Sequence, residues 1–242
     1  MSLQRFLIGI IVLLLHTSVL AKTVRAISGQ AKGLKTGQPA YQVKAQETWM
    51  GPRQARFSAQ YIDPQGRVRM TRQVVHHTDP LIPDERVEHP LTGKLTQTTR
   101  IKTGVRLSYR KKAGVATRSV VVSPPRPYLT GAGLSPYLSS QRDALMKGET
   151  LRFVMLAPSR LDWYRFRARK SRAHPAQPGQ FLVAVDTDAA VLRLFVSTMY
   201  FWFDTRTGGL MRYDGPVSVE DDDGDMLNVR IDFPMGLGAR PD

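Results

Sequence analysis

The sequence predicts a mainly β protein: a strongly curved antiparallel sheet, or an incompletely closed barrel, with one helix of about three turns packed on it. Three observations predict this class. Apolar and polar residues alternate along many short segments, glycine-containing turns separate these segments, and one segment alone has the apolar spacing of a helix. The chain contains no cysteine, so its stability must come from a hydrophobic core rather than from disulfides.

The first residues have the layout of a secretory signal peptide. Arg5 lies in a short polar segment, and an unbroken apolar run extends from Phe6 to Leu15. That run is too short to cross a bilayer as a helix, which needs roughly 20 apolar residues. We predict a signal peptide at residues 1–21 and a single β-rich domain at residues 22–242, which is periplasmic and does not span the membrane. The alternatives are secretion into the medium and anchoring by an uncleaved N-terminal helix.

The clearest hairpin is predicted around residues 63–66. The segment ARFSAQYI, residues 55–62, alternates in the manner of a half-buried strand. DPQG then supplies a proline with a fixed backbone angle and a glycine that accepts a left-handed conformation, and RVRMTRQVV returns as the second strand. Similar turns in LKTGQ, LTGK and TRTGG predict a meander of hairpins rather than repeats of fixed period.

One segment, SPYLSSQRDALMKG at residues 135–148, is predicted to be helical. Ser135 is suited to the N-cap, Pro136 to the first helical position, and Gly148 to the end of the helix. Its mainly apolar face has three- and four-residue spacing, so the helix is expected to lie on the sheet. The preceding SPPRPYLTGAG, residues 123–133, is rich in proline and glycine and predicts an irregular connection.

Six further strands are predicted after the helix. Their sequences are ETLRFVML, LDWYRFRARKS, QFLVAVD, MYFWFDT, GLMRYDGPVSV and MLNVRIDF. The residues expected on the buried face of the last strand are Leu227, Val229, Ile231 and Phe233.

The run EDDDGD, residues 220–225, gathers acidic side chains within a basic chain. It lies between two predicted strands, and Asp-Gly is common in tight β-turns because glycine accepts a positive φ. A calcium loop needs glycine at its sixth residue and glutamate at its twelfth, where this sequence has Met226 and Asp232. We therefore predict a turn rather than a calcium site.

A second polar segment, VVHHTDPLIPDERVEH, brings imidazoles together with carboxylates, a combination that can hold zinc or another divalent ion. Its spacing matches no known zinc pattern, because Glu85 stands where the H-x-x-E-H arrangement needs histidine. Adjacent His76 and His77 would also point to opposite faces of a strand. We predict a polar connection with no metal and no other cofactor.

No motif indicates catalysis. The sequence has no G-x-S-x-G nucleophile motif and no cysteine, and GAGLS lacks the lysine and the serine or threonine that a phosphate-binding loop needs. The spacing of the carboxylates does not mark an acid–base pair. We therefore predict that the protein is not an enzyme.

Two strands carry features typical of binding. In LDWYRFRARKS the arginines share one face, where they must be solvated, paired with carboxylates across strands, or bridged by an anion; we favour pairing. In LRLFVSTMYFWFDT both faces are apolar, which fits a strand covered on both sides or the wall of an apolar cavity; core packing is our default.

The formal net charge of +15 predicts attraction to polyanions or anionic membrane surfaces. Export makes nucleic acid an unsuitable partner, so lipid head groups or acidic polysaccharides are the expected polyanions. The alternative interpretation is a solvated basic face that has no partner.

The chain resembles a family of uncharacterised exported bacterial proteins with a domain of unknown function. The resemblance lies in SGQAKGLKTGQPAYQ, AQYIDPQGRVRMTRQVV, DALMKGETLRFVMLAPSRLDWYRFRARK and FDTRTGGLMRYDGPVSVEDDDGDMLNVRIDFP. This family implies no catalytic residue and favours a periplasmic location. In its overall architecture this family is similar to the periplasmic lipoprotein carriers, whose open β-barrel encloses an apolar cavity.

We therefore predict a non-catalytic envelope protein that binds an apolar or amphipathic ligand, a lipid or acyl chain, on the concave side of the sheet. The residues expected at the ligand are Phe166, Phe181, Phe195, Met199, Tyr200 and Trp202, with Arg165, Arg167 and Arg169 at an anionic head group. The alternative is a structural or interaction protein with a filled core that binds an envelope polyanion or a partner protein through its basic surface. A metal-dependent hydrolase using the segment from His76 to His89 is the third hypothesis.

Overall fold

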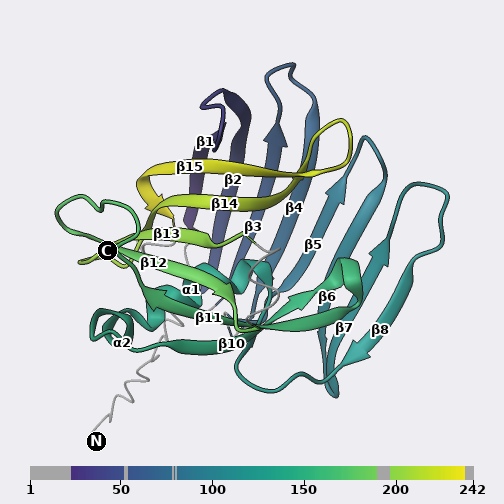
Figure 1. Ribbon diagram of the computed structural model, residues 1–242. Helices are drawn as coiled ribbons and strands as arrows, with labels where there is room; N and C mark the ends of the chain where they lie inside the picture. Colours follow the sequence, from purple (N-terminus) through teal and green to yellow (C-terminus); the bar gives the residue numbers. More distant parts are fainter. Residues whose placement is uncertain (1–22, 52–53, 78, 80, 190–196, 238–242) are drawn as a thin grey trace, which may run out of the picture.

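The computed structural model of the protein describes residues 23–51, 54–77, 79, 81–189 and 197–237. Within these residues the chain forms one sheet of 15 strands with helices on one side (Figure 1). The strands are β1 (Thr23–Gly33), β2 (Pro39–Gly51), β3 (Gln54–Ile62), β4 (Val68–His76), β5 (Asp84–His89), β6 (Lys94–Ile101), β7 (Gly104–Arg110), β8 (Arg118–Val122), β9 (Tyr128–Leu129), β10 (Leu151–Ala157), β11 (Asp162–Lys170), β12 (Gln180–Thr187), β13 (Met199–Asp204), β14 (Leu210–Glu220) and β15 (Met226–Leu237). The helices are α1 (Gly131–Ser140) and α2 (Arg142–Met146), and a 3-10 turn, η1 (Pro158–Arg160), precedes β11. The predicted fold class, a curved sheet with one main helix, is confirmed.

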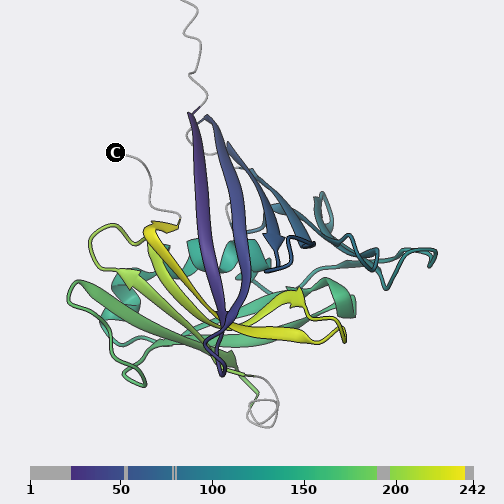
Figure 2. The same cartoon turned by 90° about the horizontal axis from the view of Figure 1, so that it is seen from above.

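The sheet consists of two meanders joined by the first and the last strand. Its order is β8-β7-β6-β5-β4-β3-β2-β1-β15-β14-β13-β12-β11-β10-β9, and the neighbours are antiparallel except for β9 and β10. Ala31 of β1 lies opposite Ile231 of β15. We call β1–β8 the first half and β9–β15 the second half. Seen from above, β1 and β2 stand between the blue strands of the first half and the yellow and green strands of the second (Figure 2).

The predicted turns are confirmed. Residues 63–66 join β3 to β4, and Gly66 adopts the left-handed φ of +80° that the turn requires. The three Thr-Gly turns join β1 to β2, β5 to β6 and β13 to β14. The acidic run forms the turn between β14 and β15, where the Asp221 side chain accepts hydrogen bonds from the backbone N–H groups of Asp223 and Asp225.

The helix begins earlier than we predicted. α1 starts at Gly131, and its N-cap is Thr130, whose side chain accepts a hydrogen bond of 3.1 Å from the Gly133 N–H. Ser135, the predicted N-cap, lies inside α1, so that prediction is wrong. A Cβ atom on Gly133 would lie 2.1 Å from the carbonyl oxygen of Leu81. The glycines that predict an irregular connection therefore allow the helix to approach the backbone closely.

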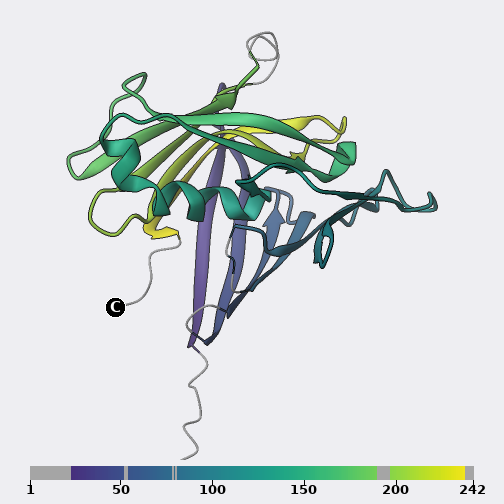
Figure 3. The ribbon, with the colours of Figure 1, turned by 90° about the horizontal axis from the view of Figure 1, so that it is seen from below.

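The helices lie on the sheet, as predicted for the one expected helix, and cover the inner face of the second half. Leu138 of α1 and Leu145 of α2 are fully buried in the main core cluster, which also contains Phe203 of β13. The ring of Tyr137 in α1 contacts that of Phe153 in β10, with centroids 5.4 Å apart. Seen from below, the helices lie in front of the strands of the second half (Figure 3). No helix in the described residues is long and apolar enough to span a bilayer.

A second apolar cluster connects the two halves near the ends of the sheet. Val105 and Leu107 of β7 share it with Val154 and Leu156 of β10. β7 and β10 are not neighbours in the strand order, so these side chains meet across the space between the two halves. The curved sheet is therefore held together here by packing rather than by strand pairing.

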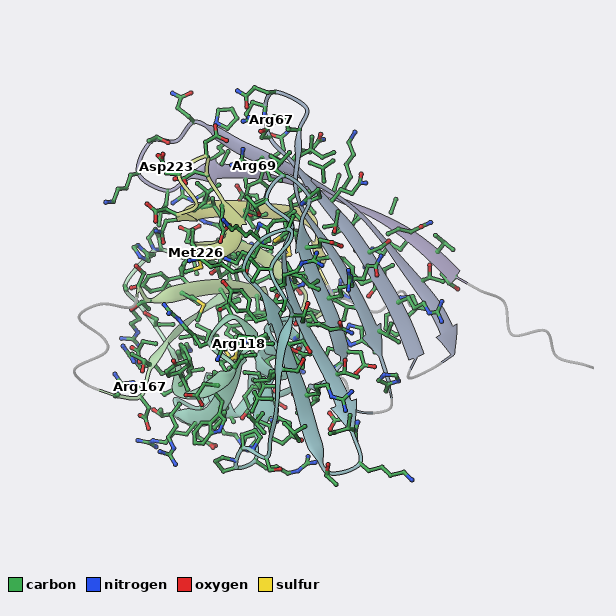
Figure 4. The ribbon with its side chains drawn as sticks, turned by 90° about the vertical axis from the view of Figure 1, so that its right-hand side faces the viewer. Arg67, Arg69, Arg118, Arg167, Asp223 and Met226 are labelled. Carbon is green, nitrogen blue, oxygen red and sulfur yellow. The ribbon has the colours of Figure 1, made fainter. Side chains whose placement is uncertain are left out.

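Charged residues that we call the latch (Arg69, His89, Lys94, Glu220 and Asp222) also connect the two halves. Arg69 of β4 forms an ion pair with Asp222 and donates hydrogen bonds to the backbone carbonyl of Glu220. The Glu220 carboxylate pairs with Lys94 of β6, and His89 Nδ1 lies 3.7 Å from it. Figure 4 shows Arg69 near the tip of the β14–β15 hairpin. The latch thus joins strands that the sheet does not pair.

We expect Leu138→Ala to lower the free energy of unfolding by about 2–5 kcal/mol, because a fully buried leucine leaves a cavity. Urea denaturation followed by circular dichroism measures this change. Val121→Ala is the control: Val121 is exposed on β8, and its truncation should change stability by about 0.5 kcal/mol or less. Small and equal effects in the two variants would contradict a filled interior beneath α1.

The latch predicts a loss of stability in mild acid. Burial lowers the pKa of His89 from its ordinary value of 6.5; Glu220 opposes this effect, whereas Lys94 and Arg69 add to it. Below pH 6.5 the unfolded chain therefore binds a proton that the folded protein does not, so stability falls as the pH drops. We expect His89→Gln to flatten this loss. Urea midpoints compared from neutral pH downwards measure it, and equal slopes for both proteins would exclude His89 as the cause.

Candidate functional site

Alternation along the strands divides the predicted ligand-binding residues between the two faces of the second half. The inner face, toward the helices, carries Phe166, Phe181 and Met199. The outer face carries Tyr200, Trp202, Arg165, Arg167 and Arg169. Phe195 lies outside the described residues. The structure therefore does not bring the predicted residues together in one pocket.

The inner-face residues pack against the protein's own side chains. The ring of Phe181 stacks with that of Phe203 at a centroid distance of 5.5 Å, and Phe166 stacks with Phe153 at 6.4 Å. Met199 packs against the same cluster. The inner-face residues of the aromatic segment therefore pack in the core, which is the interpretation that we favoured over a cavity wall.

The outer face of the second half carries a charged group that we call the arginine face. It consists of Arg165, Arg167, Arg169, Arg212 and Arg230, with Asp186 and Asp214. Arg167 Nε donates a hydrogen bond of 2.6 Å to one carboxylate oxygen of Asp186, and Arg169 Nη1 donates one of 2.7 Å to the other. The favoured prediction, pairing of these arginines with a carboxylate across strands, is confirmed for Arg167 and Arg169.

Asp214 repeats the same arrangement two strands away. Arg212 Nη2 and Arg230 Nη2 donate hydrogen bonds of 2.8 Å and 3.0 Å to its carboxylate. The side chains of Asp186 and Asp214 are 4% and 6% exposed, whereas those of Arg169 and Arg230 are 42% and 43% exposed. Each covered carboxylate is therefore matched by two guanidinium groups, and one of each two reaches solvent.

The electrostatics keep both aspartates ionised. Burial alone would raise the pKa of Asp186, but hydrogen bonds from Arg167 and Arg169 outweigh burial and lower it. Burial would likewise raise the pKa of Asp214, but hydrogen bonds from Arg212 and Arg230 outweigh burial and lower it. Each ionised carboxylate is shared by two arginines, and two further carboxylates lie near them, because Asp188 also acts on Arg167 and Asp232 on Arg230.

Aromatic residues between these groups hold the arginines in place. Trp202 is 2% exposed, its Nε1 donates a hydrogen bond of 3.0 Å to the Pro175 carbonyl, and the Arg212 guanidinium lies 4.4 Å above its ring. The Arg165 guanidinium lies 5.5 Å from the ring of Trp163. Trp202 therefore supports Arg212 and is not free to contact a ligand.

Sequence reasoning missed four members of the arginine face: Arg212, Arg230, Asp186 and Asp214. A signal existed for one pair, because Arg212 and Asp214 are two residues apart on a strand and must share a face. No sequence pattern indicates that Asp186 pairs with Arg167 and Arg169, because this pairing requires β12 to lie beside β11.

The histidine-rich segment is divided between separate places. His77 Nε2 lies 3.1 Å from a carboxylate oxygen of Asp84, whereas His89 belongs to the latch. Glu85 pairs with Arg72 at 2.5 Å. Among the residues that the structure describes, no three His, Cys, Asp or Glu side chains are grouped in a way that could hold a metal ion.

Comparison with solved structures finds a similar chain. No protein-family model and no curated protein matches the sequence. The crystal structure of a beta-barrel-like protein of the domain of unknown function DUF1849 from Brucella abortus is similar, with 10% sequence identity, a TM-score of 0.44, and coverage of 86% of this chain and 94% of that chain. No residue of this chain takes a role from that protein.

We expect Asp186→Asn to lower the free energy of unfolding by about 1–2 kcal/mol at pH 7, because Arg167 and Arg169 lose a charged partner but remain partly solvated. A carboxylate whose pKa is lower in the folded than in the unfolded state stabilises the fold at a pH above its unfolded pKa. This stabilisation is lost as the pH falls through the folded pKa. The difference from the wild type should therefore shrink below pH 3.8.

Urea denaturation at neutral and acidic pH checks this expectation. Asp143→Asn is the matched control, because the Asp143 side chain is 83% exposed and pairs with Arg142 at 3.3 Å, away from the arginine face. Such a pair contributes about 0–1 kcal/mol. A loss for Asp186→Asn no greater than for Asp143→Asn would show that Asp186 does not organise the arginines.

Proposed function

We propose that this protein is a non-catalytic envelope protein that binds an anionic surface or polymer through the arginine face. The observation that carries the proposal is the sharing of each covered aspartate, Asp186 and Asp214, by two arginines. A carboxylate holds two guanidinium groups in a fixed geometry, and the donors left over suit phosphate or carboxylate oxygens. In this proposal the ligand supplies the anionic oxygens that accept from these donors.

The spacing of the two groups favours a ligand with several anionic centres. Tyr200 of β13 lies opposite both Ala184 of β12 and Asp214 of β14, and Asp186 is two residues further along β12. With strands about 4.8 Å apart and a rise of about 3.3 Å per residue, the two carboxylates are separated by about 12 Å. Lipid head groups in a membrane surface or the repeating units of an acidic polysaccharide can occupy both groups at once.

The first hypothesis, an apolar ligand on the concave side, receives less support from the packing. Phe166, Phe181 and Met199 contact the core cluster that also contains Leu138 and Leu145 of the helices. A lipid at these positions would have to displace the helices from the sheet. The arginine face needs no such rearrangement, because the exposed guanidiniums of Arg169 and Arg230 are already accessible.

The environment of this activity follows from the expected export of the chain. A periplasmic or secreted protein meets anionic lipid head groups and acidic polysaccharides rather than nucleic acid. The formal net charge of +15 would add long-range attraction to either. The arginine face supplies the local contacts in this proposal.

We expect the wild type to co-sediment with phosphatidylcholine vesicles that contain phosphatidylglycerol, and to bind inorganic polyphosphate. Arg169→Gln together with Arg230→Gln should weaken both interactions about tenfold or more, because each cation near an anionic surface contributes about 1 kcal/mol. Binding should also weaken in 1 M salt, where the Debye length is about 3 Å.

The matched control is Arg56→Gln together with Arg106→Gln, which removes the same charge from exposed positions of the first half. Equal losses in the two double variants would show that net charge, not the arginine face, determines binding. Binding to vesicles alone would identify a membrane surface as the ligand. Binding to polyphosphate alone would identify a soluble polymer as the ligand. A lipid retained in the purified protein, detected by native mass spectrometry, would favour the concave side instead.

A further inference from the structure

The strand β8 presents an unpaired edge at one end of the sheet. In the described residues it pairs with β7 alone, and it is the terminal strand of the order (Figure 1). The other end is β9, which has only two residues. An edge strand exposes N–H and C=O groups that a further strand can pair with.

β8 contains no proline and no lysine, and Arg118 at its start is its one charged residue. Natural edge strands are protected by proline, by lysine or by inward-pointing charge. β8 has the sequence RSVVV, and its prolines, Pro124 and Pro125, come only after the strand. Ser119 is exposed, and Val121 is 49% exposed. An apolar, unblocked edge of this kind is suited to a partner strand.

A hollow of about 470 Å³ lies beside this edge, where the first half meets η1 of the second. Its lining includes Tyr109, Arg118 and Val120 on one side and Arg160 and Leu161 on the other. Leu161 has φ +54°, and among the described residues it is the one non-glycine residue with positive φ. A left-handed leucine costs about 1–2 kcal/mol, and strain of this kind concentrates at binding sites.

The charge at this hollow is positive and unmatched. The side chains of Arg118 and Arg160 are exposed, and neither forms an ion pair within the described part of the chain. The group is distinct from the other charged regions, because Arg118 lies apart from Arg69 of the latch and from Arg167 of the arginine face in Figure 4. A ligand here must therefore offer a strand-forming main chain and an acidic group.

We propose that β8 and this hollow bind an extended, acidic segment of a partner protein. The main chain of that segment continues the sheet along β8, and alternate side chains point toward the hollow because successive residues of a strand face opposite sides. A carboxylate on that side reaches Arg118 and Arg160, with which it forms charge-assisted hydrogen bonds. A second copy of this chain fits less well, because two β8 edges would bring arginines of like charge together.

The test uses a fluorescent peptide of alternating valine and threonine with one central aspartate, added to the whole protein. Two matched peptides replace the aspartate with asparagine or methylate the backbone nitrogens that would donate to β8. Fluorescence anisotropy should show affinity about tenfold weaker for each matched peptide, since each lacks one of the two interactions. NMR-detected hydrogen exchange should show protection of the β8 amides by the aspartate peptide.

Arg118→Gln together with Arg160→Gln should weaken binding of the aspartate peptide about tenfold and leave the affinity for the asparagine peptide unchanged. Arg106→Gln, at an exposed position on the neighbouring β7, is the control and should bind like the wild type. Absence of binding, equal affinity for the methylated peptide, or protection outside β8 would overturn the proposal. Equal affinity for the asparagine peptide would overturn the role of the two arginines, and none of these results depends on the arginine face.

Discussion

The pairing of β1 with β15 is the contact on which the rest of the structure depends. It joins residues near the two ends of the described chain, with Ala31 opposite Ile231, and so unites two meanders that are otherwise built from neighbouring strands. Buried residues of both meanders share one core cluster, which includes Tyr61 of the first half and Phe203 of the second. Once β1 and β15 are paired, the curvature of the sheet brings the two apolar faces toward each other. A pairing of such long range has a large entropic cost, which explains why packing and the latch must add to it.

This construction determines where binding is available. The helices fill the inner face of the second half, and the cluster around Leu107 and Leu156 fills the space between the halves. The latch places Arg69 and Asp222 across the same space. Because apolar packing and ion pairs both hold the halves together, a ligand that entered between them would have to break both. The outer face and the free edge of β8 involve no such cost, and both carry arginine.

The local parts of the fold were predictable from the sequence, and the long-range parts were not. The turn ending at Gly66 depends on four consecutive residues, which is why it was predicted correctly. The start of α1 was not predicted correctly. Glycine is needed at position 133 because the backbone of Leu81, far away in the sequence, lies too close for a side chain. The same limit applied to the site. Alternation placed Arg167 and Arg169 on one face, but only the neighbouring strand β12 shows that Asp186 is their common partner.

The sharing of one aspartate by two arginines is itself an argument about function. A fold that needed only neutrality at Asp186 would be served by one arginine, and a second guanidinium nearby adds repulsion at little gain in stability. The arrangement recurs at Asp214, so the sharing of one carboxylate by two arginines is not confined to one place. What two guanidiniums on one carboxylate do provide is rigidity, since each side chain is held in one orientation before a ligand arrives. Less conformational entropy is then lost on binding an anion, which is the condition under which surface charges contribute to affinity.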